Sequence, residues 1–210
     1  GAFFGHRQRG VMVAENRCSA YRDIVSCVNL APKKNWLVRK PMRNILLDLR
    51  NDHLAGRRGG RVAICSSRRD VLEAAVELAM SWDDHLLVEV TANQVNQYGG
   101  YSGMTPAAFA SEIDRIALAM GFPRSRILLG ADHLGPYIWR NEPVESAMRK
   151  SVELVQQCVR AGFSKIHMDT GFGCADDPRP ELPPELAAER AVTLCRAAES
   201  AAEQLPSTAS

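Results

Sequence analysis

Short apolar runs alternate with longer amphipathic segments along most of the chain. The apolar runs predict buried strands, and they cover Arg61 to Ser66, Leu86 to Thr91, Ile127 to Ala131 and Lys165 to Thr170. Apolar residues recur at helical spacing in the segments between and around them, at 43–54, 70–82, 105–121, 143–160 and 185–203. Four successive strand–helix units predict a parallel sheet with right-handed crossovers.

Residues that favour helix ends support these boundaries. Thr105 precedes Pro106, which predicts an N-cap followed by a proline at the first helical position, and Gly121 is placed to end the same helix. Asp70 is a second natural N-cap, and Gly162 is expected to end the helix before the fourth strand.

The number of strand–helix units restricts the possible folds. A complete (β/α)8 barrel takes about 250 residues, whereas the organised part of this chain covers only 42–203. We therefore predict an α/β fold of the TIM-barrel family that covers about the first four βα units, as a half-barrel or a truncated barrel. An open doubly wound sheet is the alternative.

Charge separates the start of the chain from the rest. Residues 1–41 contain eight Lys or Arg and two Asp or Glu, whereas the remaining residues are mildly acidic, although the whole chain has a net charge of +2. We predict that 1–41 is a basic, poorly ordered extension outside the fold and that 204–210 is a tail. An acidic main domain argues against nucleic-acid binding.

Composition also bears on the compartment. The six cysteines are scattered and form no CxxC motif, which is typical of reduced thiols in a cytoplasmic protein. No apolar stretch reaches the roughly 18 residues that a membrane span needs, and the first residues lack the pattern of a signal peptide.

The candidate chemistry begins where the third strand ends. Gly130-Ala-Asp-His-Leu-Gly-Pro follows an apolar run, so Asp132 and His133 lie at the carboxyl edge of a parallel sheet, where such folds keep their sites. The alternative is that Asp132 only caps a helix beside a packed histidine.

Strand alternation brings further polar groups to this edge. If Ile166 and Met168 face the helices, His167 and Asp169 face the other side together, and the same argument turns Glu89 inward. Imidazole and carboxylate groups together suit a divalent metal such as Zn²⁺ or Mn²⁺. The alternatives are that Glu89 pairs with a buried Lys or Arg and that His167 is a core histidine.

The loop from Asn93 to Met104 is long and rich in amides, tyrosines and glycines. Amides hydrogen-bond sugar hydroxyls well, and glycines let the backbone approach a phosphate, so the loop favours ligand binding over a purely connecting role. The predicted substrate-binding residues are Glu89, Asn93, Gln94, Asn96, Gln97, Gly99, Gly100 and Asp169.

Three long motifs resemble one protein family. The run from Val88 to Pro106, the segment Gly130-Ala-Asp-His-Leu-Gly-Pro and the segment from Arg160 to Asp169 are similar to the accessory subunits of class II D-tagatose-1,6-bisphosphate aldolases. The resemblance covers about 42–203. It implies a TIM-type barrel that acts in tagatose, galactitol and amino-sugar breakdown.

The resemblance also implies roles for individual residues. In catalytic relatives the Asp of the Asp-His pair transfers protons and the His binds Zn²⁺, so Asp132 is the predicted acid/base and His133, with His167, the predicted metal ligands. The subunits most similar to this chain are regarded as non-catalytic, and they support a separate catalytic aldolase subunit. Members continue through four further βα units, and their first βα turn is longer than the one after Ile64 here.

Two functions therefore compete. The first is an accessory, non-catalytic subunit whose partners are a catalytic aldolase subunit and a sugar phosphate, working as part of an oligomer. The second is a metal-dependent ketose epimerase or aldolase that is active by itself, with Asp132 as its acid/base. Binding of nucleic acid through residues 1–41 is a third and weaker hypothesis.

Overall fold

The computed structural model describes residues 45–178 and 180–205. In chain order the elements are α2 (Ile45–Leu54), β1 (Ala63–Cys65), α3 (Arg69–Ser81), β2 (Leu86–Thr91), α4 (Pro106–Met120), η1 (Arg124–Arg126), β3 (Ile127–Leu134), η2 (Pro136–Trp139), α5 (Val144–Arg160), β4 (Lys165–Met168) and α6 (Pro184–Glu203). The predicted extension at 1–41 lies outside the described residues, as does the end of the predicted tail.

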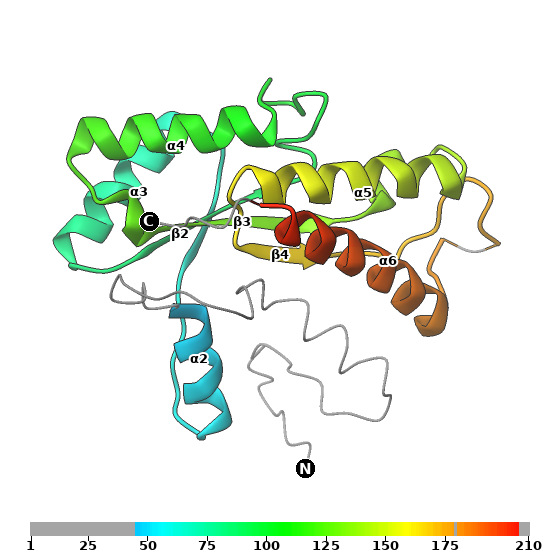
Figure 1. Cartoon of the computed structure of the whole chain (residues 1–210), viewed down its shortest axis with the longest axis horizontal. Helices are drawn as coiled ribbons and strands as arrows, with labels where there is room; N and C mark the ends of the chain where they lie inside the picture. Colours follow the sequence, from blue (N-terminus) through cyan, green and yellow to red (C-terminus); the bar gives the residue numbers. More distant parts are fainter. Residues whose placement is uncertain (1–44, 179, 206–210) are drawn as a thin grey trace, which may run out of the picture.

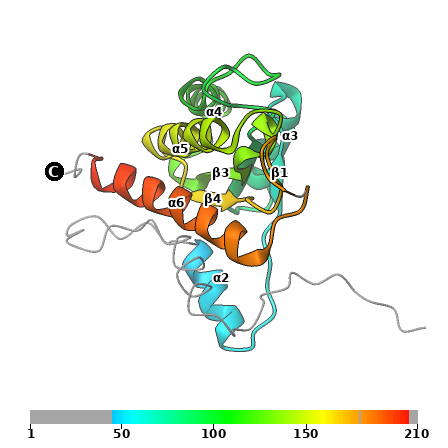
Figure 2. The same ribbon diagram turned by 90° about the vertical axis from the view of Figure 1, so that its right-hand side faces the viewer.

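The four strands form one parallel sheet in the sequential order β1-β2-β3-β4. Figure 1 shows the crossover helices α3, α4 and α5 on one side of this sheet. In Figure 2, α6 lies beside α5, whereas α2 lies on the opposite side of the sheet. A doubly wound sheet has crossover helices on both faces and a reversal in strand order. The arrangement is therefore a partial TIM-barrel-like fold, and the doubly wound alternative is wrong.

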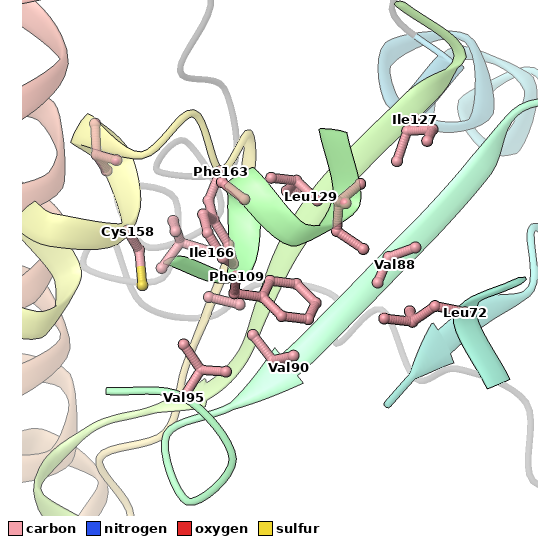
Figure 3. Close-up of a cluster of buried hydrophobic side chains, with 14 of the residues drawn as sticks. Leu72, Val88, Val90, Val95, Phe109, Ile127, Leu129, Cys158, Phe163 and Ile166 are labelled. Atoms are coloured by element: carbon pink, nitrogen blue, oxygen red, sulfur yellow. The ribbon is translucent and has the colours of Figure 1, made fainter. Parts of the chain in front are cut away.

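The hydrophobic core fills the space between the sheet and the crossover helices (Figure 3). Val88 and Val90 of β2 point into it, as the alternation predicts, and so does Leu129 of β3. Phe109 of α4 is completely buried, and its ring lies 6.2 Å from that of Phe163. This face of the sheet holds the fold together by burying apolar area.

The predicted helix boundaries agree with the structure at α4. The Thr105 hydroxyl accepts a hydrogen bond from the backbone N–H of Ala108, and Gly121 ends the helix in the left-handed conformation. The predicted cap at Asp70 is wrong, because α3 begins one residue earlier and Arg68 occupies the N-cap position. The Asp70 carboxylate instead accepts hydrogen bonds from the Arg68 guanidinium.

The strands differ from the prediction mainly at their ends. β2 has the predicted limits, whereas β1 is shorter than predicted and β3 continues to Leu134, three residues beyond the predicted end. The extension of β3 therefore places the polar Asp132 and His133 within a strand and not in the loop after it. No helix in the described part of the chain is long and apolar enough to cross a membrane.

Candidate metal and acid–base site

The face of the sheet away from the crossover helices carries polar side chains in layers. Cys65, Glu89, Gly130 and Lys165 are neighbours across the four strands and form one layer. The Glu89 carboxylate is buried and forms an ion pair with the Lys165 ammonium over the intervening glycine. Glu89 thus pairs with a basic residue, as the alternative expects, although Lys165 is only partly buried.

A β-bulge in β3 explains how two consecutive residues reach the next layer. Ala131 pairs with Ile166 and Leu134 with Met168, so β3 uses three steps where β4 uses two. His133 is the extra residue of the bulge, and its φ of +52° is uncommon for a residue other than glycine. Asp132 and His133 can therefore both turn to the polar face, while Leu134 returns to the core.

Four polar side chains contact one another above the Glu89–Lys165 layer. His167 Nδ1 lies 2.7 Å from Asp132 Oδ1, and His133 Nδ1 lies 3.1 Å from Asp169 Oδ2. The two imidazole rings are 4.7 Å apart between centroids, and His133 Nε2 is 3.6 Å from Asp132 Oδ2. The structure thus brings together Asp132, His133, His167 and Asp169, as the strand alternation predicts.

Gly135 permits the close approach that places Asp169. The backbone N–H of Asp169 donates to the carbonyl of Leu134 over 2.8 Å. A Cβ atom at position 135 would lie 1.7 Å from the carbonyl oxygen of Asp169, which is far inside contact distance. A glycine directly after the bulge is therefore required for the chain beyond β4 to reach His133.

The donor set fits a divalent metal ion. Asp132, His133 and His167 each offer a ligand atom, and these atoms all lie within 4.8 Å of one another. When the two carboxylates are ionised they can only accept a hydrogen bond, so Nδ1 of each histidine then donates and Nε2 is the ring nitrogen available to a metal. Carboxylates that orient metal-binding histidines in this way are common around zinc.

Cys65 and Lys165 are two members of this face that the sequence-based prediction missed. Lys165 has the same strand parity as His167, so the alternation argument could have found it. Burial raises the pKa of the Cys65 thiol, and the nearby carboxylates of Asp132 and Glu89 raise it further. Cys65 is therefore held in its neutral form at the rim of the site.

The amides of the loop after β2 mostly bind the protein itself. The Gln94 side-chain oxygen accepts from the backbone N–H of Thr91 over 2.7 Å and from the Cys65 thiol over 3.6 Å. Asn96 donates to the carbonyl of Ala92, and Gln97 donates to the carbonyl of Lys150 on α5. These three amides fix the loop against β2 and α5.

The glycines of this loop serve the same turn. The N–H groups of Gly99 and Gly100 both donate to Asn96, to its backbone and its side-chain oxygen respectively. Gly100 has a φ of +56°, and a Cβ there would lie 2.4 Å from the carbonyl oxygen of Gln94. Asn93 is exposed at the edge of the loop. Substrate binding by these residues stays a prediction.

The fold and the site together define an α/β protein of partial TIM-barrel type with a candidate divalent-metal site at the carboxyl ends of its strands. The family model for the GatZ/KbaZ-like D-tagatose-1,6-bisphosphate aldolase subunit matches residues 46–210. The chain therefore belongs to the GatZ/KbaZ-like family of D-tagatose-1,6-bisphosphate aldolase subunits, which confirms the resemblance of its motifs.

Individual relatives agree with this assignment. The D-tagatose-1,6-bisphosphate aldolase subunits GatZ of Salmonella paratyphi B and of Salmonella typhimurium are each 51% identical over 152 residues, which cover 72% of this chain and 36% of theirs. A crystal structure of a probable tagatose 6-phosphate kinase from Sinorhizobium meliloti superposes with a TM-score of 0.64 at 45% identity, covering 66% of this chain and 36% of that one. The chain thus spans about a third of the length of these relatives.

Proposed function

We propose that the chain acts within a class II D-tagatose-1,6-bisphosphate aldolase as the non-catalytic subunit that supports the catalytic one. The observation that carries the proposal is the 51% identity to GatZ subunits, in a region that includes most of the described sheet. We place its role in cytoplasmic breakdown of tagatose, galactitol and amino sugars. The partners are a catalytic aldolase subunit and a sugar phosphate, within an oligomer.

We further propose that the site takes a divalent metal ion, with Zn²⁺ as the first candidate. His133 and His167 would hold the ion through Nε2, with Asp132 beside them. In class II aldolase chemistry such an ion polarises the ketose carbonyl and stabilises the enediolate. The fit of the donor atoms, all within 4.8 Å of one another, supports this part of the proposal.

The chain's own residues would hold and orient these ligands. Asp169 accepts from Nδ1 of His133 and fixes that ring, and Asp132 does the same for His167. If the chain is instead an enzyme in its own right, Asp132 would take or give the proton beside a bound ketose. Among the predicted substrate-binding amides of the loop after β2, Asn93 is the exposed one and would meet a sugar hydroxyl.

The test is release of triose phosphate from tagatose 1,6-bisphosphate by a catalytic aldolase subunit, with and without this chain. We expect the chain to be inactive alone and to raise the rate or the lifetime of the catalytic subunit. A chain that neither binds nor stabilises the catalytic subunit would show that the proposal is wrong.

The same assay separates the accessory role from independent catalysis. Activity of the chain alone that disappears in Asp132→Asn would make it an enzyme in its own right, with Asp132 as its acid/base. Support of the partner that survives Asp132→Asn would instead mean that the accessory role does not use this carboxylate. Zn²⁺ binding measured by calorimetry, for the parent chain and for His133→Ala, tests the metal site independently of activity.

A further inference from the structure

We propose that the Glu89–Lys165 ion pair, which spans β3 at Gly130, is a positioning device that sets the metal affinity of the layer above it. The inference rests on the metal site proposed above, and it adds Lys165 and Gly130 to the residues on which that site depends. Glu89 and Lys165 lie outside the candidate ligand group of Asp132, His133 and His167. Both act through the strands that carry Asp132 and His167.

The pair joins two strands that are not neighbours. Glu89 lies on β2 and Lys165 on β4, and both are in register with Gly130 of the strand between them. A Cβ atom on Gly130 would lie 2.8 Å from Cγ of Glu89 and 3.0 Å from its Oε1. The missing side chain at position 130 is therefore the space through which the ion pair passes.

The pair lies directly beneath the candidate ligands. Asp132 follows Gly130 by two residues and His167 follows Lys165 by two, so each lies one layer above a member of the glycine-centred layer on its own strand. The contact between Asp132 of β3 and His167 of β4 therefore lies one layer above the ion pair by which Lys165 of β4 reaches Glu89 of β2. Together the two links tie β4 to β2 in the lower layer and to β3 in the layer where the ligands face one another.

The position of the bulge adds to this argument. The pairing of β3 with β4 is regular at Gly130 and Ala131 and shifts only above them. Because the ion pair holds the three strands together at Gly130, the extra residue of β3 must be accommodated above that layer. It is accommodated at His133, the residue whose ring meets His167 and Asp169.

Charge and burial favour a positioning role over a general contribution to stability. The Glu89 side chain is 7% exposed and that of Lys165 is 27% exposed, so the pair lies on the polar face and outside the hydrophobic cluster. Replacing a whole buried ion pair by uncharged residues is often neutral for stability. We therefore expect removal of this pair to change the metal site more than it changes the fold.

The test measures Co²⁺ affinity, and the visible spectrum of the bound ion, in the full chain and in four variants. We expect Lys165→Met and Glu89→Gln/Lys165→Met to lose affinity about tenfold, the range known for residues outside the ligand shell. The reciprocal variant Glu89→Lys/Lys165→Glu rebuilds the pair over Gly130, and we expect it to recover most of the affinity. Arg126→Met is the matched control, because it breaks an ion pair with Asp83 that lies before β2 and β3 begin.

The melting temperature of the metal-free protein is recorded for each variant. Lost affinity and an altered spectrum in the Lys165 variants, recovery in the reciprocal variant and an unchanged site in Arg126→Met would support the inference. Parent-like affinity in Glu89→Gln/Lys165→Met, or no Co²⁺ binding by the parent chain, would overturn it. Failure of the accessory function is seen separately, as absence of any effect on the catalytic aldolase subunit.

Discussion

The two faces of the sheet use the same strands for different purposes. On the face beneath the crossover helices, Val88, Val90 and Leu129 are buried among apolar side chains. The residues that follow Val88 and Leu129, Glu89 and Gly130, lie on the other face. There Glu89 forms an ion pair across the space left by the glycine. Along each strand, one residue therefore packs against a helix and the next one faces the candidate site.

Because the two faces are separate, the residues that stabilise the fold can be altered without altering the residues that form the site. Apolar packing is insensitive to which polar group stands on the opposite face, because successive side chains of a strand point apart. Substitutions under the helices should therefore lower the free energy of unfolding and leave the metal site intact. Substitutions on the polar face should change metal affinity more than they change the free energy of unfolding.

The largest expected effect is on the helix-covered face. Phe109→Ala should lower the free energy of unfolding by about 4 kcal/mol, because it removes a fully buried ring and leaves a cavity. Urea denaturation measures the loss. The matched control is Leu118→Ala on the same helix, a side chain that is 84% exposed and should change stability by less than about 0.5 kcal/mol. Similar losses in both variants would contradict the assignment of the core.

The second effect concerns an ion pair that lies on neither face. Asp177, in the loop after β4, binds the buried Arg190 of α6 through two hydrogen bonds of 2.9 and 2.6 Å. Asp177→Asn should lower the free energy of unfolding by about 3 kcal/mol near neutral pH, because it leaves the guanidinium buried without a counter-charge.

The pH dependence of this pair has a definite sign. The hydrogen bond from Arg190 holds the pKa of Asp177 below its usual range. Its stabilisation is therefore present above the ordinary aspartate pKa of about 4 and is lost as the pH falls through the lowered value. Urea denaturation of the parent and of Asp177→Asn should give a difference in stability that shrinks steadily as the pH falls below about 4. A constant difference across this range would show that the pair does not titrate as described.

The third effect should fall mainly on the polar face. Gly135→Ala places a methyl group against the carbonyl of Asp169, so we expect a loss of about 2 kcal/mol in stability and a larger relative loss of metal affinity. Gly171→Ala is the matched control, because its Cβ would meet only Oδ1 of Asp169 at an ordinary 3.9 Å. Calorimetric titration with Zn²⁺ and thermal unfolding measure the two quantities. Equal Zn²⁺ affinity in both variants would show that the metal site does not depend on Gly135.

The smallest effect is on reactivity alone. Because its pKa is raised, the Cys65 thiol should react with iodoacetamide more slowly near neutral pH than an ordinary exposed cysteine. Asp132→Asn removes one negative charge and so lowers that pKa, which should raise the rate on the order of twofold without changing stability. Mass spectrometry of the Cys65 peptide follows the reaction. The buried Cys158 serves as an internal control that should stay unmodified in the folded chain.

Much of this architecture could be predicted from the sequence. The limits of β2, the caps of α4 and the inward direction of Glu89 and His167 follow from alternation and from local turn chemistry, which act over a few residues. The motifs around Asp132 identified the family without reference to the fold. Alternation also allowed the pairing of Glu89 with a basic residue, although it did not single out Lys165.

Other features depend on contacts between strands and could not be read from one segment. The bulge in β3 exists only relative to β4, so nothing in the local pattern distinguished Asp132 as the end of a strand from Asp132 as part of one. Gln94, Asn96 and Gln97 have the amides expected of ligand-binding residues, yet their partners lie in β2, the loop itself and α5. The N-cap of α3 could not be predicted either. Asp70 is the residue whose side chain favours that position, but Arg68 occupies it.

The bulge at Asp132 and His133 has a consequence at the level of the gene. Deleting the single codon for His133 would leave Ala131 and Leu134 on the core face with only Asp132 between them, which is the spacing of an uninterrupted strand. Such a deletion would keep the reading frame and the hydrophobic pattern while removing one of the proposed metal ligands. In this chain a change of three nucleotides could therefore remove the proposed metal site and leave the scaffold in place.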